Sequence, residues 1–210
     1  IAAGKSLLYR EPPHYITLGK ELPAKALDEI LTDHAEVFTE LKEYYKQTSE
    51  SDTTKISFYE DTYSLYNLYR FAHYYEEAYG KYIWLKSGAS LVIEHTEAMT
   101  VIDVNTGSVL KKKKQEDTLF YQINREAAKE IARQLRLRNI SGIIMIDFIN
   151  MKDTAQKEKL LSLLDSECKK DRVHCNVIDM TALNLVEMTR SKVRKPLHEQ
   201  IRSCMKNNRS

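Results

Sequence analysis

Two short apolar runs, each with one aspartate near its end, stand on either side of a long amphipathic segment. The runs are Met99 to Val104, which contains Asp103, and Gly142 to Phe148, which contains Asp147. Runs rich in β-branched residues favour strands, and the segment from about Thr118 to Asn139 has the periodicity of a helix. A strand–helix–strand unit brings parallel strands together with their carboxyl ends at one edge of a sheet. The sequence therefore predicts an α/β fold that places the two carboxylates close together.

The two aspartates indicate a site for a cation. We expect their strands to be buried on both faces, where a carboxylate is tolerated only if a cation or hydrogen-bond donors compensate it. With the nearby amide Asn105, Asp103 and Asp147 make a set of oxygen ligands suited to Mg²⁺ or Mn²⁺. Aspartates at strand ends also cap turns and helices, and the spacing alone leaves both interpretations open.

The same region resembles a known family over a long stretch. The sequence HTEAMTVIDVNTGS from His95, followed by NREAAKEIARQLRLRNISGIIMIDFINM from Asn124, closely resembles the catalytic core of the bacterial ribonuclease E and G family. In that family the residues matching Asp103 and Asp147 hold a catalytic magnesium, and the one matching Asn105 orients the first aspartate. The resemblance implies a Mg²⁺-dependent endoribonuclease that cuts single-stranded, A/U-rich RNA to 5′-phosphate and 3′-hydroxyl ends during RNA processing and decay.

The resemblance also suggests how the chain is organised. Residues 1–80 look like part of the family's ribonuclease-H-like subdomain, and residues 81–210 look like its deoxyribonuclease-I-like catalytic subdomain with a basic tail. The expected fold is thus α/β, with a mixed sheet and flanking helices. The family's oligonucleotide-barrel module and most of its 5′-end sensor find no counterpart, and we interpret the chain as a fragment of a longer protein. Two alternatives stay open: a catalytically inactive RNA-binding or scaffold relative, and a phosphoesterase acting on small phosphates.

Basic charge is concentrated in the part of the chain that carries the aspartates. Residues 1 to 80 hold 8 Lys and Arg against 14 Asp and Glu, whereas residues 81 to 210 hold 24 against 16. A basic field around an acidic metal site suits a polyanionic substrate, although a solvated surface gives the same composition. The candidate RNA contacts are Lys112 and Lys113 in a lysine run, Arg136 and Arg138 at the end of the central helix, and His174 and Arg190, which the resemblance suggests.

Cysteine usage and hydropathy limit the cofactors and the compartment. Three cysteines without CxxC spacing favour free thiols and a cytoplasmic location over a disulfide framework. The resemblance implies a paired-cysteine motif after the catalytic core that shares zinc between subunits. Cys204 stands near that place, but residues 205–210 supply no second cysteine, so structural Zn²⁺ is not expected in this chain. Any homodimer would form without a paired-cysteine zinc link. No apolar run approaches the roughly 20 residues that a membrane span needs.

The first half of the chain gives a less complete prediction. Residues 22 to 31 form either a helix after Pro23 or, by the family comparison, a segment that ends in a strand over residues 29–32. We expect a helix over residues 35–46, a loop over 47–54 and a strand over 55–59. A single helix over residues 61–79 carries seven aromatic side chains, which at helical spacing belong in the core more often than on an RNA-stacking surface.

Overall fold

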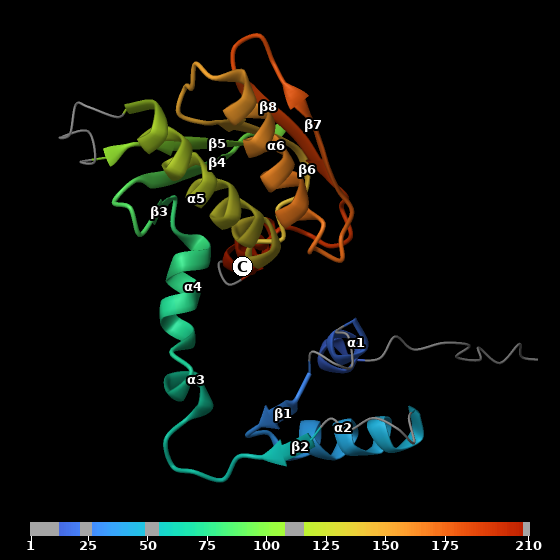
Figure 1. The fold of residues 1–210 in the computed structure, drawn as a ribbon. Helices are drawn as coiled ribbons and strands as arrows, with labels where there is room; N and C mark the ends of the chain where they lie inside the picture. The colour runs from blue at the N-terminus through green and yellow to red at the C-terminus, as the bar shows by residue number, and fades with distance from the viewer. Residues whose placement is uncertain (1–12, 22–26, 49–54, 108–115, 208–210) are drawn as a thin grey trace, which may run out of the picture. The chain divides into compact units, whose positions relative to one another are not determined.

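The chain consists of two compact units, residues 1–72 and residues 73–210 (Figure 1). The computed structural model describes residues 13–21, 27–48, 55–107 and 116–207. The division falls inside α4 (Phe71–Tyr79), ahead of the predicted boundary at Gly80. The assignment of residues 1–80 and 81–210 to two nuclease subdomains stays a prediction. None of the described helices combines the length and the apolarity of a membrane span.

The N-terminal unit pairs two short parallel strands with a helix. It contains α1 (His14–Glu21), β1 (Glu29–Thr32), α2 (Ala35–Thr48), β2 (Lys55–Phe58) and α3 (Leu65–Leu68). Glu29 lies opposite Lys55 across the strand pair, and Leu41 of α2 is buried. The strand over residues 29–32 and the helix from residue 35 are thus confirmed. The predicted loop begins later than expected, because α2 continues to Thr48, and residues 49–54 lie outside the described ones.

The prediction of one helix over residues 61–79 with its aromatics in a core is wrong. Two helices, α3 and α4, are separated by Arg70, whose φ of 53° lies in the left-handed region that a helix cannot contain. On α4 the aromatic residues recur at helical spacing on one side, and this side is exposed. The aromatic side chains that are exposed are Tyr63, Tyr66, Tyr69, Phe71, Tyr74, Tyr75 and Tyr79.

The C-terminal unit is built on a mixed sheet with the strand order β3-β4-β5-β6-β8-β7. The strands are β3 (Tyr82–Trp84), β4 (Ser90–His95), β5 (Met99–Asn105), β6 (Gly142–Asp147), β7 (Cys175–Met180) and β8 (Leu185–Arg190). The central pair, β5 and β6, is parallel, and the other pairs are antiparallel. The predicted α/β class with a mixed sheet and flanking helices is confirmed.

Two helices pack side by side on one face of this sheet (Figure 1). They are α5 (Glu116–Leu137), which connects β5 to β6, and α6 (Thr154–Cys168), while α7 (Leu197–Asn207) follows β8. The predicted amphipathic helix is confirmed, because the residues of one side of α5, Ile123, Ala127, Ile131 and Leu135, are all buried. The sheet residues that complete this core include Ile102, Val104, Ile144 and Ile146. We call this side the helix-covered face.

The opposite side of the sheet is exposed, so the expectation of strands buried on both faces is wrong. Ile143 of β6, for example, is 49% exposed, although its neighbour Ile144 is fully buried. Antiparallel strands flank the parallel pair, and sheets of this kind often leave one side to solvent. Strand alternation and register assign to this open face Tyr82, Trp84, Val92, Val101, Asp103, Asn105, Ile143, Met145, Asp147, Leu185, Glu187 and Thr189.

Candidate active site on the open face

The structure brings the two aspartates together. Asp103 of β5 lies directly opposite Asp147 of β6 in the parallel strand pair. Adjacent strands are about 4.8 Å apart, and both side chains leave the sheet on the open face. Asp103 is half-buried and Asp147 is exposed. Both carboxylates can therefore reach the same small volume above the sheet, where solvent and a ligand have access.

Local contacts give the pair an asymmetric electrostatic character. The side-chain amide of Asn105 donates a hydrogen bond from Nδ2 to Oδ2 of Asp103, with a distance of 2.7 Å. Burial, and then the negative charge of Asp103, raise the pKa of the Asp147 carboxyl above its ordinary value. The helix that follows β6 is capped by Asp153, whose Oδ1 accepts the N–H of Ala155, rather than by Asp147. The pair is thus two neighbouring negative charges, of which one is oriented by an amide.

The donor set fits a hard cation that keeps open positions. Mg²⁺ usually binds proteins through one or two carboxylates and completes its coordination with water and substrate phosphates. Asp103 and Asp147 supply such a pair. Among the described residues no group of three or more His, Cys, Asp or Glu side chains is arranged to hold a metal ion. Closed zinc sites have four protein ligands, so the two aspartates alone do not resemble one.

A buried asparagine holds the backbone that follows Asp147. Asn124 of α5 is fully buried, and its Nδ2 donates to the carbonyl of Ile149 at 2.7 Å while its Oδ1 accepts the Ile149 N–H at 3.0 Å. These two bonds fix the segment just beyond the end of β6 against the helix. Sequence reasoning missed Asn124. The available signal is its position next to Ile123 on the apolar side of a helix, where a polar group needs a partner.

The end of β5 is held by a close approach of two glycines. Gly107 has a φ of +57°, and a Cβ atom at this position would lie 2.5 Å from the carbonyl oxygen of Gly88. Only glycine therefore lets the chain after Asn105 pack on the turn between β3 and β4. That turn is held in addition by Glu126 of α5, whose Oε1 accepts the N–H of Lys86 at 2.7 Å.

Two of the candidate RNA contacts, Arg138 and Arg190, are buried and engaged by the protein. Both are 4% exposed. Arg190 donates from Nε to Asp171 at 2.9 Å and from Nη1 to the carbonyl of Ile140 at 2.9 Å. Arg138 donates from Nε to Gln134 at 2.6 Å and from Nη2 to the carbonyl of Glu77 at 2.9 Å. The structure does not bring either arginine to the open face.

The other candidate contacts also lie away from the aspartates. His174 is exposed just before β7. Along the strand direction it lies six residues, or about 20 Å, from Asp147, because Asp147 pairs with Leu185 at one end of β8 and His174 lies beside the other end. Arg136 is exposed on α5 and reaches the carbonyl of Glu167 at 3.4 Å. Lys112 and Lys113 lie outside the described residues.

Two aromatic side chains on the open face were missed by sequence reasoning. Tyr82 and Trp84 of β3 are 60% and 72% exposed. The register places Tyr82 two strands from Asp103, and Trp84 two strands from Asn105, or about 10 Å in each case. The signal was the alternation of β3, because Ile83 faces the core and its neighbours must face outward.

Comparison with known proteins decides the family. Residues 2–193 match the model of the Ribonuclease E/G family. This chain belongs to the ribonuclease E/G family. The membership predicted from the sequence around the two aspartates is thereby confirmed, and the match covers both units of the fold.

Named ribonucleases align with most of the chain. It is 37% identical to Ribonuclease G of Haemophilus influenzae over 193 residues, which cover 92% of this chain and 39% of that relative. Identity to Ribonuclease G of Escherichia coli is 38% over 171 residues, covering 81% and 35%. Identity to Ribonuclease E of Nostoc sp. is 32% over 197 residues, covering 92% and 28%. The chain thus spans well under half of the length of these ribonuclease E/G relatives.

Proposed function

We propose that this chain carries the active site of a Mg²⁺-dependent endoribonuclease, with Mn²⁺ as a substitute ion. The observation that carries the proposal is the register of Asp103 opposite Asp147 on an exposed sheet face, with Asn105 bonded to the first carboxylate. Two like charges in direct cross-strand contact destabilise a sheet unless a ligand offsets them. Membership of the ribonuclease E/G family makes RNA the substrate that we infer.

The two aspartates and the asparagine have separate roles in this proposal. Asp103 and Asp147 would hold the ion, and Asn105 keeps the Asp103 carboxylate in one orientation through the bond to Oδ2. When bound, Mg²⁺ would polarise the scissile phosphate and offset the charge that develops there. Burial, and then the charge of Asp103, raise the pKa of the Asp147 carboxyl, and a cation between the two carboxylates would relieve their repulsion.

The reaction that we propose is hydrolysis. The oxygen of a water molecule forms a bond to phosphorus as the water gives up a proton, the bond from phosphorus to the 3′ oxygen breaks, and the 3′ oxygen takes up a proton. The products carry a 5′-phosphate and a 3′-hydroxyl, and the 2′-hydroxyl is not the nucleophile.

Tyr82 and Trp84 support single-stranded RNA as the occupant of the open face. Exposed aromatic rings bind single strands because every base offers a face for stacking, with about 1–3 kcal/mol per base. These rings stand on the same face as the aspartates, about two strand spacings away. Bases must be unpaired to stack on them, and A/U-rich segments pair weakly. We therefore propose A/U-rich single strands as the preferred substrate.

Cleavage of a 5′-monophosphorylated, A/U-rich single-stranded RNA tests the proposal. We expect cutting in Mg²⁺ or Mn²⁺, none in EDTA, and a loss of about a thousandfold or more in Asp147→Asn, because such a site contributes several kcal/mol. Glu158→Gln, which removes an exposed carboxylate of α6, is the matched control and should keep full activity. Ligation and phosphatase treatment of the fragments identify the end groups.

Two results of this assay would contradict the proposal. Intact RNA under all conditions, from a folded chain, would overturn the proposal of catalysis, and RNA binding that persists would then favour a scaffold role. Preferential turnover of a small phosphoester that RNA does not inhibit would favour the phosphoesterase alternative. A homodimer and a cytoplasmic location stay predictions, which sedimentation and cell fractionation test. The described cysteines, Cys168 and Cys175, are free thiols.

A further inference from the structure

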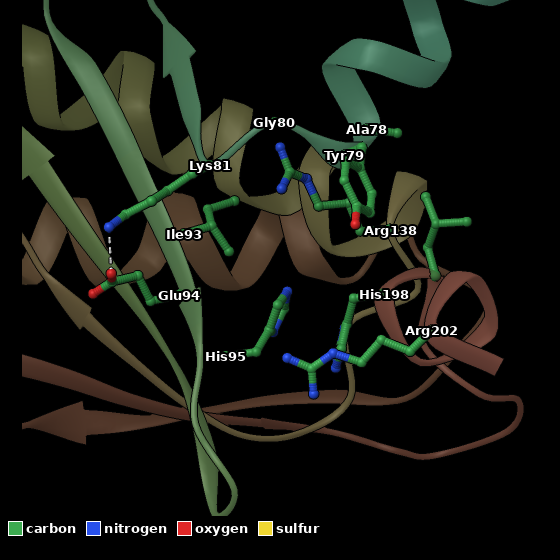
Figure 2. A pocket seen from close by; sticks show the side chains of 11 residues that line it. Ala78, Tyr79, Gly80, Lys81, Ile93, Glu94, His95, Arg138, His198 and Arg202 are labelled. Atoms are coloured by element: carbon green, nitrogen blue, oxygen red, sulfur yellow. Dashed lines mark ion pairs between the residues drawn. The ribbon is translucent and has the colours of Figure 1, made fainter. Parts of the chain in front are cut away.

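A basic pocket lies where β4 ends at His95, next to the end of α4 and the start of α7 (Figure 2). It has a volume of about 360 Å³, which falls within the roughly 300–1,000 Å³ of small-ligand sites. His95 of β4 pairs with Thr100, three residues before Asp103 on β5, and both His95 and Thr100 belong to the helix-covered face. The side chains that define this pocket are Tyr79, Lys81, His95, Arg138, His198 and Arg202.

Positive charge in the pocket exceeds negative charge. Among the described lining residues the one carboxylate is Glu94, and it forms an ion pair with Lys81 at the rim (Figure 2). Arg138 and Arg202 enter from the end of α5 and from α7, and the figure shows the Arg202 side chain extending toward His95. The pocket thus contains two guanidinium groups whose charge the lining residues do not neutralise.

Arg138 is a buried cation that is held in place by neutral acceptors. Its Nε and Nη2 donate to the side chain of Gln134 and the carbonyl of Glu77, and the described residues supply no acceptor for Nη1. Burial lowers the pKa of its guanidinium to about 10, although the carboxylate of Glu130 acts in the opposite direction. An anion in the pocket would offset this desolvation and take the remaining donor.

Two histidines stack beside the arginines. The rings of His95 and His198 are 3.8 Å apart between centroids and inclined by 15°, and Nδ1 of His95 lies 3.0 Å from the hydroxyl of Thr100. Burial, helped by His198 and the arginines, lowers the pKa of His95 to about 4, and burial also lowers the pKa of His198. Both rings are therefore neutral at neutral pH, and a neutral imidazole carries one N–H donor.

The start of α7 adds a further preference for anions. Leu197 and His198, the first residues of this helix, line the pocket, and the Leu197 N–H donates to the carbonyl of Arg138 at 2.9 Å. The N-terminus of a helix carries a partial positive charge that favours anionic ligands. The charge, the hydrogen-bond donors and the volume of the pocket thus all favour a small anionic ligand.

We propose that this pocket binds a phosphate monoester no larger than a mononucleotide. The guanidinium groups of Arg138 and Arg202 contact the phosphate, and the histidine pair supplies additional donors. Tyr79, which is 53% exposed at the mouth, offers a ring for a nucleobase. Inorganic phosphate and nucleotides share this chemistry, and binding is independent of the proposed nuclease activity.

Ligand binding is coupled to proton uptake. A phosphate dianion in the pocket favours the protonated form of both imidazoles, so the bound ligand raises the pKa of His95 and of His198 above their values in the free chain. The charged groups around the two rings are Lys81 and Glu94 at the sheet edge, Arg138 after α5, and Lys192, Glu199 and Arg202 near or on α7. Lys81 pairs with Glu94 and Lys192 with Glu199. The two arginines act on His95, whereas His198 is affected by Glu199, which raises its pKa, and by Arg202 and Lys192, which lower it.

Calorimetric titration of the whole chain with inorganic phosphate, AMP and adenosine tests this site. We expect phosphate and AMP to bind, with tighter binding by AMP if the base stacks on Tyr79, and adenosine to show no binding at the same concentrations. Arg202→Ala should weaken AMP binding about tenfold, which corresponds to the loss of one charge-assisted contact. Lys195→Ala removes an exposed positive charge nearby that does not line the pocket, and should change the affinity less than about twofold.

Histidine ring NMR signals locate the ligand. His95 and His198 should shift during the AMP titration, and these shifts should disappear in Arg202→Ala while circular dichroism stays unchanged. The absence of binding by both phosphate and AMP at millimolar concentration would overturn the proposal. Equal weakening by Lys195→Ala and Arg202→Ala would overturn it as well, because binding would then follow net charge rather than this pocket.

Discussion

The two faces of the C-terminal sheet place polar side chains in opposite surroundings. On the helix-covered face, Asn124 and Arg190 are buried, and the protein satisfies them with hydrogen bonds. On the open face, Asp103 and Asp147 stand next to each other, and burial together with their repulsion raises the pKa of Asp147. The first arrangement stabilises the fold, whereas the second is unfavourable for the protein alone. This contrast is the basis for our proposal that the open face holds a cation.

The largest effect that we expect is loss of stability in Arg190→Met. The side chains of Arg190 and Asp171 are 3% and 4% exposed, so the variant leaves a buried carboxylate without its partner. Urea unfolding should show a loss of about 3–5 kcal/mol. Arg190→Met combined with Asp171→Leu should recover part of it. If Arg190→Met keeps its stability but loses RNA binding, the RNA contact predicted for Arg190 from the sequence would be supported. The claim that the helix-covered face serves only stability would then be wrong.

Asn124→Ala should have the next largest effect. The substitution leaves the N–H and the carbonyl of Ile149 without their partners, and should lower the free energy of unfolding by about 1–3 kcal/mol. The matched control is Asn176→Ala, at an exposed position of β7, for which we expect a change below about 0.5 kcal/mol. Equal effects of the two substitutions would mean that Asn124 does not fix the segment after Asp147.

Trp84→Ala should act on RNA binding and not on stability. Affinity for single-stranded RNA should fall by about 1–2 kcal/mol, the contribution of one stacked base. Because Trp84 is the only tryptophan of the sequence, quenching of its fluorescence reports stacking directly. Leu183→Ala, at a side chain that is 79% exposed in the turn before β8, is the control. If RNA binds without quenching, the open face is not the surface that holds the bases.

Asp147→Asn should stabilise the ion-free protein slightly. The pKa of Asp147 is raised in the folded state, so its ionised form disfavours folding at pH values above that pKa. The variant should gain roughly 0.5 kcal/mol at neutral pH, typical of relieving one like-charge pair in a sheet. The gain should vanish near pH ~3, where the carboxyl is protonated in both states. Urea unfolding without divalent ions measures it, and a loss of stability at neutral pH would contradict the repulsion.

The sequence predicted the strand pair and the meeting of the aspartates because both follow from local pattern. Two apolar runs with an intervening helix leave few ways to pair Asp103 and Asp147. The prediction for the open face failed, since the run from Ile143 to Ile146 is continuously apolar and looks like part of a strand buried on both sides. Ile143 is nevertheless exposed, because coverage depends on where α5 and α6 pack.

Individual side chains were harder to predict than the strands. A basic residue near a predicted nuclease site suggests a phosphate contact, but whether Arg190 reaches solvent depends on Asp171, which is distant from the apolar runs that guided the prediction. The exposure of Tyr82 and Trp84 could have been predicted, because side chains alternate along β3 and Ile83 is buried. The pocket at His95 and His198 could not be predicted from the sequence, because its residues come from segments about 100 positions apart that only the tertiary fold brings together.

Binding of Mn²⁺, followed by electron paramagnetic resonance, tests the central claim most directly. We expect the chain to bind the ion at the open face and Mg²⁺ to compete for the same site. Asp103→Asn and Asp147→Asn should each weaken binding at least about tenfold, because each removes one charged ligand. Glu158→Gln on α6 should leave the affinity unchanged. Equal Mn²⁺ affinity in the wild-type chain and in both aspartate variants would contradict the claim that the open face holds the metal.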